Sequence, residues 1–437
     1  MVFNVQLFRR SRVYPVTAYG ADPTGQSDST NAILGAISDA FQAPSNRVLI
    51  EGIVDLGGAE IHLEGGTYLI SQPLGMPSSG AGNFMIHGGS LRASDDFPTD
   101  RYLIEISTGS SSSSKSQDNK QDYSAAAASA SGYAFEDITL KDLLLDSNYR
   151  GGGMLVVNSV RTKIDNCYIS HFTSDGILAK GGHETYIRSS FIGQHITAGG
   201  DKLEKNFTGT GINLMGNDNA LTDVVIFSAA VGVMLSGQAN LLTNVHCYNK
   251  ATYWGGVGIY VRLPGLSQTR IVNCYLDYNG IVAEDPVQLT ISNSFFLGDA
   301  YIKLKSINGE IKGVYIVDNL FNGDDKGTPI VHLDQSKMPF TTIEDVSIDR
   351  NNAKGMAVKS TVARGVAQGN ASSWTLDFTK VLLFPNLINH VHYTLSTDGT
   401  IPNHALRNVS HNRVVVQSSV AVPATVYVTV EQGVSTV

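Results

Sequence analysis

The sequence predicts an all-β solenoid, and two repeated columns of residues carry that prediction. Aromatic side chains recur through the middle of the chain at intervals of 20 to 36 residues, mostly within short strand-like runs. The column consists of Tyr168, Phe191, Phe227, Tyr248, Tyr275, Phe295 and Phe321. Repeats of this length are typical of β-solenoids, whose stacked coils place equivalent residues about 4.8 Å apart. We therefore expect these side chains to form a ladder along the coils.

Glycine supplies a second column in the same rhythm. Its members are Gly176, Gly211, Gly232, Gly258 and Gly280. Glycine at a fixed place in every coil suits a corner with positive φ, or a close approach of two backbones. Both columns contain one long interval in the same coil, which predicts an insertion between His195 and Phe207. A β-sandwich with regular strands is the alternative, but the agreement of two columns favours the solenoid.

Composition excludes several classes of function. The chain has 437 residues, 42% hydrophobic and 16% charged, so it can bury a large core. Length alone suggests about three domains, but a solenoid grows without closing a new core. A net charge of −8 argues against nucleic-acid binding, and no apolar run is long enough to span a membrane. With 31 basic residues against 39 acidic ones, an anionic ligand requires a local basic cluster.

The ordered part is expected to begin near Tyr14 with a strand, a turn and then a helix over 29–41. Ser27 or Asp28 suits the N-cap of that helix. Apolar residues follow at helical spacing, at Ile33, Ile37 and Phe41. An amphipathic helix here can cover the open end of the solenoid, whose terminal coil otherwise exposes its core and strand edges.

The remaining elements follow in order. Strands are expected over 48–55, 60–70 and 83–91. Residues 108–132 are rich in serine and alanine and predict a flexible loop that projects from one coil. Regular coils are expected over 135–352, and antiparallel strands over 374–384, 391–396, 413–418 and 425–430. The predicted domains are therefore a solenoid with its N-terminal cap, 14–358, and a C-terminal β module, 359–437.

The three cysteines, Cys167, Cys247 and Cys274, all lie in the column just before the aromatic one. We expect buried thiols, because neighbouring residues of a parallel ladder are poorly oriented for a disulfide. No spacing resembles a metal site, and we expect neither metal nor cofactor. Glycosylation sequons occur at Asn206, Asn370 and Asn408. They fit a secreted protein whose leader lies outside this sequence.

Several stretches resemble a known family. Tyr19-Gly20-Ala21-Asp22 and the coil repeats resemble right-handed parallel β-helix proteins of the pectin-lyase-like class. A narrower resemblance, to plant QUARTET-type polygalacturonases, covers nearly the whole chain. It rests on the stretches Gly88–Ser94, Leu145–Gly153, Gln194–Asp201 and His404–Ser410. The resemblance implies a secreted, monomeric glycoprotein that hydrolyses the α-1,4 bonds of polygalacturonate in the cell wall, as in pectin around pollen tetrads.

The chain departs from the motifs of glycoside hydrolase family 28. Those enzymes carry Asn-Thr-Asp, then Asp-Asp, Gly-His-Gly and Arg-Ile-Lys on later coils. Here Thr173-Ser174-Asp175 resembles the first motif, but Gly209-Thr210-Gly211 replaces the acidic pair. The third coil has Ala230-Val231-Gly232 and no histidine. The resemblance therefore implies a functional role for Asp175, which matches the first motif. It also implies one for Arg262, in Tyr260-Val261-Arg262, as a substitute for the last motif.

Residues that alternate outward after the glycine column define a candidate binding face. Lys180 and Arg262 suit the carboxylates of an anionic polysaccharide such as pectin, and Tyr260 suits stacking on a sugar ring. Asn213 and Glu284 share this face. The alternative is a solvated surface with an ion pair between Arg262 and Glu284.

Three carboxylates and one histidine are the candidate catalytic residues. They are Asp175, Asp201, Asp218 and His183, with His183 and Asp218 in equivalent places of adjacent coils. Inverting hydrolysis needs an acid and a base about 6.5–9.5 Å apart, which neighbouring coils can provide. Each also has a structural interpretation, as a corner, loop, turn or packed polar residue.

Three functions stay open at this point. A polygalacturonase is favoured. A pectate lyase would need calcium and a basic catalytic residue, and the sequence shows no cluster of aspartates for that ion. A non-catalytic wall-polysaccharide binder would explain the missing acidic pair.

Overall fold

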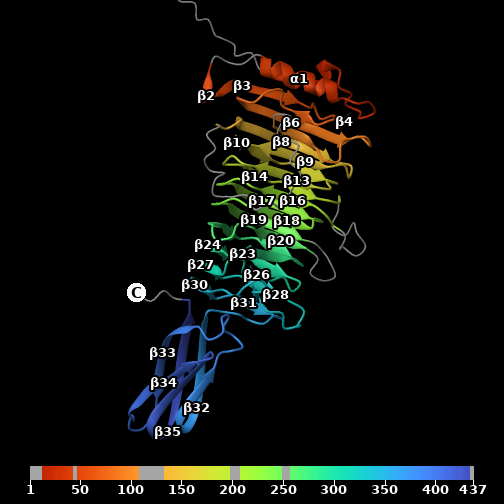
Figure 1. Ribbon diagram of the computed structural model, residues 1–437. Coiled ribbons are helices and arrows are strands. Elements are labelled where there is room, and N and C mark those ends of the chain that lie inside the picture. Colours follow the sequence, from red (N-terminus) through yellow and green to blue (C-terminus); the bar gives the residue numbers. More distant parts are fainter. Residues whose placement is uncertain (1–11, 43–46, 108–131, 197–206, 249–255, 434–437) are drawn as a thin grey trace, which may run out of the picture. The chain divides into compact units, whose positions relative to one another are not determined.

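The computed structural model describes residues 12–42, 47–107, 132–196, 207–248 and 256–433. Of the described residues, 58% are strand and 5% are helix, and the long parallel sheets form the predicted right-handed parallel β-helix (Figure 1). The chain divides into two compact units, Met1–Gly237 and Gln238–Val437. Among the described residues, no helix has the length and apolar character required to cross a membrane.

The first unit begins with the predicted cap. Strand β1 (Val13–Pro15) and a 3-10 helix, η1 (Val16–Tyr19), precede α1 (Thr30–Gln42). The side chain of Asp28 caps the helix, because its Oδ1 accepts a hydrogen bond of 3.0 Å from the N–H of Thr30. The side chain of Ile37 is fully buried. The helix packs on β1, β3 (Ile53–His62) and β5 (Leu74–Gly75), which confirms its expected place at the first coils.

Parallel strands then build the coils of the first unit. One sheet, called here the site sheet, contains β5, β7 (Tyr102–Ile106), β9 (Gly152–Val157), β13 (Asp175–Lys180), β16 (Thr210–Leu214) and β18 (Val231–Leu235). The other strands are β2 (Val48–Ile50), β4 (Thr67–Ile70), β6 (Ala81–Ala93), β8 (Phe135–Asp146), β10 (Ser159–Val160), β11 (Lys163–Asp165), β12 (Tyr168–Ser170), β14 (Tyr186–Arg188), β15 (Phe191–Gly193) and β17 (Ala220–Phe227).

The second unit continues with parallel coils and ends in antiparallel strands. One of its sheets contains β20 (Val257–Val261), β23 (Gly280–Glu284), β26 (Ile302–Lys305) and β29 (Val331–Asp334). The other coil strands are β19 (Leu241–Tyr248), β21 (Arg270–Val272), β22 (Tyr275–Asp277), β24 (Val287–Ser292), β25 (Phe295–Leu297), β27 (Glu310–Val317), β28 (Leu320–Asn322), β30 (Thr342–Asp349) and β31 (Asn352–Lys354).

The glycine column is present in the first unit, and close packing explains it. The pairing of β13, β16 and β18 places Gly176, Gly211 and Gly232 side by side. A Cβ on Gly176 would lie 2.6 Å from the carbonyl oxygen of Gly211, and one on Gly211 would lie 2.7 Å from that of Gly232. In the second unit the register shifts, and Gly280 pairs with Val257 instead of Gly258.

The aromatic ladder forms only in part in the first unit. Tyr168 pairs with Phe191, and their rings stack with centroids 6.1 Å apart. The next residue of this column is Val225, whereas Phe227 pairs with Gly193. The prediction was wrong for Phe227, because this residue lies two positions beyond the one that continues the column.

A shift of two residues also removes Tyr248 from the ladder in the second unit. Tyr248 pairs with Asp277, and His246 takes the position opposite Tyr275. The rings of His246 and Tyr275 stack with centroids 4.2 Å apart, and Tyr275 pairs with Phe295.

Phe321 lies inside the solenoid rather than on the ladder. Its register partner is Phe296, and the two rings stack with centroids 4.4 Å apart. Phe321 is 2% exposed, whereas Phe295 is 37% exposed and pairs with Leu320. A change of one residue in register moves a strand side chain to the opposite face of the sheet.

The chain ends in a four-stranded antiparallel sheet. Strand β35 (Arg413–Gln432) lies between β32 (Val362–Asp377) and β33 (Ile388–Ser396), and β34 (His404–Ser410) also pairs with it. This sheet has its own core, which includes Trp374, Leu376, Val414, Val426 and Val428. It agrees with the antiparallel strands expected there, while the boundary at 358/359 stays a prediction.

All three cysteines are free and buried, as expected. Burial raises the pKa of Cys167 and of Cys274 to about 12, and it also raises the pKa of Cys247. These thiols are therefore protonated and unreactive in the folded chain.

Candidate active site

Asp175 begins strand β13 and receives a hydrogen bond from a tyrosine two coils away. Tyr102 pairs with Gly152 in the adjacent strand, and Gly152 lies beside Asp175 in the next. A Cβ on Gly152 would lie 2.3 Å from the Tyr102 ring, so only glycine lets that ring cross the intervening strand. The Tyr102 hydroxyl thereby donates a hydrogen bond of 2.9 Å to Oδ2 of Asp175.

The surroundings of Asp175 favour its protonated form. The side chain is half-buried, and burial raises the pKa of Asp175, although hydrogen bonds from Tyr102, Asn213 and Thr210 oppose the shift. Burial and the nearby Asp175 charge raise the pKa of Tyr102 well above its usual range. A carboxyl group whose pKa is raised, beside a neutral phenol, suits general acid catalysis.

Asn213 holds the second oxygen of this carboxyl group. Its Nδ2 lies 3.3 Å from Oδ1 of Asp175. Its Oδ1 is buried and has no hydrogen-bond partner among the described residues. An amide both donates and accepts, so Asn213 can serve the ionised carboxylate through nitrogen and the protonated acid through oxygen.

A second polar cluster lies at the corners of adjacent coils, just before the chain enters strands β9 and β13 of the site sheet. Nδ1 of His171 lies 2.7 Å from Oδ1 of Asp146. The ring of Tyr149 packs on that of His171 with centroids 4.7 Å apart, and its hydroxyl shares a hydrogen bond of 3.0 Å with Nδ1 of His195. We call Asp146, His171, Tyr149 and His195 the corner cluster.

The corner cluster combines backbone strain with a carboxylate held in its ionised form. Tyr149 and His171 have φ values of 56° and 57°, and Asn148 has 49°. Non-glycine residues in this region cost free energy and often cluster at functional sites. Burial acts to raise the pKa of Asp146, but hydrogen bonds from His171 and the N–H of Asn148 outweigh it, so that the pKa is lowered.

Sequence reasoning did not assign the corner cluster or Tyr102. The signal for the cluster was present, because two of the family-like stretches carry Tyr149 and His195, which the structure brings into contact. Tyr102 gave no signal, since it lies outside the repeated columns.

His183 and Asp218 form the predicted contact between coils. Nδ1 of His183 lies 2.9 Å from Oδ2 of Asp218, and the ring of Tyr133 packs edge-on against the histidine with centroids 6.0 Å apart. The pair follows the C-terminal ends of β13 and β16, whereas Asp175 begins β13. A six-residue strand is about 16 Å long, so this pair and Asp175 belong to separate clusters.

The other candidates of the first unit are placed as follows. Lys180 is exposed at the end of β13. Asn213 follows Leu178 and precedes Met234 in the predicted outward column. Asp201 lies outside the described residues.

The candidates of the second unit include a buried carboxylate. Glu284 is 7% exposed and accepts hydrogen bonds from the Tyr260 hydroxyl at 2.6 Å and from Nζ of Lys305 at 2.9 Å. Tyr260 is thus held by Glu284. Arg262 is exposed just after β20. In the described part of the chain, no three acidic, histidine or cysteine residues gather in a way that could hold a metal ion.

Comparison with known proteins identifies the family. No protein-family profile matches the sequence. The chain is 63% identical over 426 residues to Polygalacturonase QRT3 of Arabidopsis thaliana, a match that covers 97% of this chain and 85% of the relative.

Two solved structures share the fold at low sequence identity. The endo-xylogalacturonan hydrolase of Aspergillus tubingensis has a TM-score of 0.56 at 14% identity, over 79% of this chain and 95% of that protein. ORF18 of Geobacillus virus E2 has a TM-score of 0.55 at 10% identity, over 97% of this chain and 79% of that one. The first of these is a glycoside hydrolase by name, and both are structural neighbours of the chain. With nearly its whole length matched at 63% identity to Polygalacturonase QRT3, the chain belongs to the polygalacturonase family.

Proposed function

We propose that this protein hydrolyses the α-1,4-galacturonosyl bonds of cell-wall pectin, with Asp175 as the general acid. The observation that carries the proposal is the half-buried carboxyl of Asp175, whose pKa burial raises and which Tyr102 and Asn213 hold in place. Membership of the polygalacturonase family supports the choice of substrate.

In this mechanism Asp175 transfers its proton to the glycosidic oxygen as the bond to the anomeric carbon breaks. A water molecule attacks that carbon from the opposite face, and a base removes its proton, so the product has inverted configuration. Tyr102 stays neutral and donates to the carboxylate that Asp175 becomes. Asn213 can stabilise the same carboxylate through its amide N–H.

We assign the base to the pair of Asp146 and His171. Environments that move two pKa values apart are typical of acid and base partners, and here the pKa of Asp175 is raised while that of Asp146 is lowered. The ionised Asp146 orients His171, whose ring can accept the proton of water. His171 precedes Asp175 by four residues, in the corner that leads into β13. Asp201 and Asp218 are the competing assignments.

Substrate binding is assigned to the outward residues of the solenoid. Lys180 and Arg262 are the proposed partners for galacturonate carboxylates, and Tyr260, fixed by Glu284, for a sugar face. Secretion is part of the proposal. The sequon residues Asn370 and Asn408 are both exposed, as glycosylation would require.

The test is incubation of the purified full chain with polygalacturonate, reading reducing ends and ultraviolet absorbance together. New reducing ends without absorbance support hydrolysis, and an NMR signal for the inverted anomer supports the acid–base mechanism. Absorbance from unsaturated ends that a calcium chelator abolishes would instead indicate a lyase. Binding with neither signal would indicate a non-catalytic protein.

Five substitutions then locate the chemistry. Asp175→Asn and His171→Ala should each lower kcat by at least about 100-fold. Asp142→Asn, at an exposed carboxylate on β8, is the matched control and should change kcat little. If Asp201→Asn or Asp218→Asn abolishes hydrolysis while His171→Ala does not, the base is misassigned. If Asp175→Asn keeps the wild-type rate, the acid is misassigned as well.

A further inference from the structure

One face of the C-terminal sheet presents a row of polar, aromatic and cationic side chains to solvent. Thr429 on the central strand β35 pairs with Arg364 of β32 on one side and with His392 of β33 on the other. Tyr427 pairs in the same way with Val366 and Thr394. Residues directly opposite one another in an antiparallel sheet point to the same face, and residues two apart on a strand share that face.

Burial separates the two faces clearly. Tyr427 is 51% exposed and Val366 is 60% exposed, and Arg364 and His392 are exposed as well. The alternate residues, Val426, Val428 and Val430, are at most 2% exposed and belong to the core of the sheet. The outward row is therefore a solvent-facing surface, which we call the module face.

Two cations, Arg364 on the module face and Lys359 ahead of it in the chain, form no ion pair among the described residues. The guanidinium group of Arg364 has no ion-pair or hydrogen-bond partner among the described residues. Lys359, just before β32, donates a hydrogen bond of 3.0 Å to a backbone carbonyl, that of Lys380. Its pKa is lowered by burial alone, with no carboxylate to oppose the shift. In a chain with net charge −8, this is the kind of local basic cluster that an anionic ligand requires.

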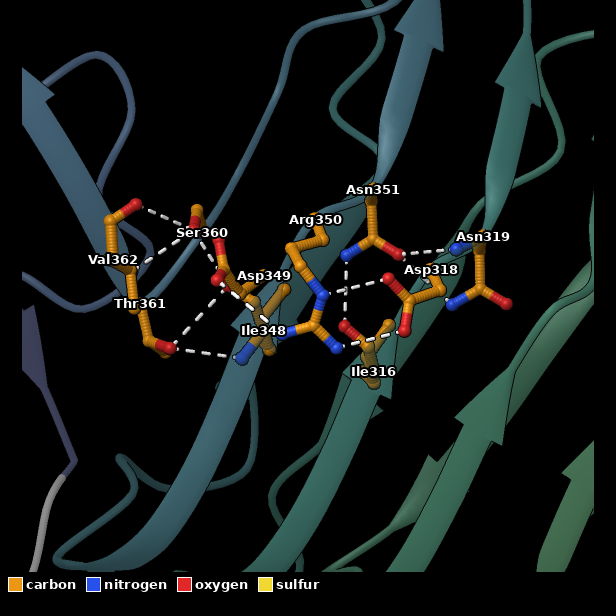
Figure 2. Close-up of polar contacts among 10 residues, drawn as sticks. All are labelled: Ile316, Asp318, Asn319, Ile348, Asp349, Arg350, Asn351, Ser360, Thr361 and Val362. Carbon is orange, nitrogen blue, oxygen red and sulfur yellow. Dashed lines mark hydrogen bonds and ion pairs between the residues drawn. The ribbon is translucent and has the colours of Figure 1, made fainter.

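Two arginines of the second unit, Arg350 and Arg413, are already paired with carboxylates. Arg350 donates two hydrogen bonds of 2.8 Å to the carboxylate of Asp318 (Figure 2). Arg413, on the C-terminal sheet, donates one of 2.9 Å to Asp377. Arg364 thus differs from these arginines in having its guanidinium available.

Lys359 and Arg364 line a common depression whose backbone is fixed. Its volume is about 290 Å³, Val362 and Val381 contribute apolar walls, and Asp349 and Arg350, whose charged groups lie 3.9 Å apart, also line it. Between the two cations, the hydroxyl of Ser360 donates to the carbonyl of Ile348 at 2.6 Å, and the N–H of Thr361 donates to it at 2.8 Å (Figure 2). These bonds hold the backbone of the segment against the last coils, so a ligand has to order only the two cationic side chains.

We infer that the module face binds a carboxylated polysaccharide, as a surface separate from the proposed catalytic cluster. Arg364 can hold a uronate carboxylate bidentately, and Lys359 can contact the same or the next one. The exposed Tyr427 ring can stack on a sugar face, while Thr394, Thr429 and His392 supply hydrogen bonds to hydroxyl groups. The outward residues Val362, Arg364, Val366 and Gln368 of β32 each begin a row that crosses β35 and β33. The one carboxylate in these four rows is Glu431, which lies in the end row beside His390.

The experiment is affinity electrophoresis of the full chain in gels that contain polygalacturonate or neutral dextran. The inference rests on the proposed function only for the choice of polygalacturonate as probe. All proteins carry Asp175→Asn, so that the polymer persists in the gel whether or not the parent hydrolyses it. Arg364→Ala, Lys359→Ala and Tyr427→Ala are compared with Arg413→Ala, an exposed arginine of the same sheet that removes the same charge. Thermal unfolding of each variant verifies that it is folded.

We expect Arg364→Ala and Lys359→Ala each to weaken binding to polygalacturonate by about three- to tenfold, and Arg413→Ala by less than about twofold. Tyr427→Ala should weaken binding as well, and added salt should reduce the differences among the variants. Equal retardation of Arg364→Ala and Arg413→Ala overturns the inference, as does an equal loss in dextran. A failure to hydrolyse pectin would overturn the proposed function and leave this comparison intact.

Discussion

The hydroxyl group of Tyr102 influences how firmly Asp175 retains its proton. A hydrogen bond donated to a carboxylate stabilises the charged form, so this bond lowers the pKa of Asp175 against the effect of burial. Tyr102→Phe removes it, and the pKa of Asp175 should rise further. Since the general acid must be protonated, the alkaline limb of the kcat/KM profile should move to higher pH. Tyr315→Phe, on an exposed side chain, should leave the profile unchanged. A limb that stays in place or moves to lower pH would contradict the assignment.

Asp175 should also reduce stability at neutral pH. Its folded-state pKa lies above the unfolded value, so the stability present below the unfolded pKa is lost as pH rises through the folded one. Asp175→Asn avoids this loss. The variant should therefore have a higher Tm than the parent at pH 7, and the difference should shrink as pH falls toward the usual range for aspartate. A variant that is less stable at pH 7 would show that the ionised carboxylate is favoured in the fold.

Contacts between single residues were predictable from the sequence where the glycine column relates adjacent coils. His183 and Asp218 follow Gly176 and Gly211 at equal spacing, which predicts their contact, although the structure pairs His183 in register with Asn217, one residue earlier. The contact of Tyr102 with Asp175 spans 73 residues and two coils, and it depends on Gly152 having no side chain. The corner cluster depends on a left-handed backbone conformation at Tyr149 and His171. That conformation could not be predicted from the sequence, because residues other than glycine rarely adopt it.

Among the elements, strands β13, β16 and β18 are held together most closely at their glycines. Gly176→Ala places a methyl group 2.6 Å from a carbonyl oxygen of the next coil, so the coils must separate locally. We expect a loss of about 1–3 kcal/mol in the free energy of unfolding, measured by urea denaturation. Gly75→Ala in β5 is the control, because nothing lies within 4 Å of its added methyl group. Equal losses for the two variants would mean that the close approach does not limit the coil spacing.

The corrected register of β25 and β28 gives a second test at this scale. Phe321→Ala removes a buried ring from a stacked pair and should cost about 3–5 kcal/mol. Phe295→Ala removes a partly exposed ring and should cost much less. Losses of similar size would favour the regular aromatic ladder that the sequence suggests.

Spacing in the sequence predicts the number of coils better than their register. The turns between strands differ in length, so an aromatic residue can recur at an even interval and still shift within its strand. A shift of two, as for Phe227 and Tyr248, keeps the side chain on the same side of the strand, although Phe227 is only 4% exposed there. A shift of one, as for Phe321, turns it inward. The glycines of the first unit keep their register because backbone contact tolerates no other residue there.

For the whole molecule, the cap protects the first coils. Ile37 in α1 is fully buried, and Ile37→Ser should cost about 2–5 kcal/mol and loosen the helix. Freed strand edges pair readily with other chains. The variant should therefore associate, as measured by size-exclusion chromatography with light scattering. Ser38→Ala in the same helix is the control. A variant that stays monomeric and stable would show that the helix is dispensable.

The architecture as a whole was predictable because repetition encodes it many times over. Three aromatic residues, Phe227, Tyr248 and Phe321, do not keep the predicted register. The repeat is still recognisable, because both the aromatic and the glycine column show it. The C-terminal sheet was visible as a change of rhythm after Lys359, but its polar face was not, since the side to which Arg364 points depends on pairing with β35.

The three buried thiols give each compact unit its own internal reporter. Cys167 lies in the first unit, and Cys247 and Cys274 lie in the second. A thiol that is both enclosed and protonated reacts with an alkylating reagent only when its surroundings open. Peptide masses after timed labelling therefore record how often each unit opens, without any engineered probe. A ligand that slows labelling at Cys247 and Cys274 alone would reveal which unit it stabilises.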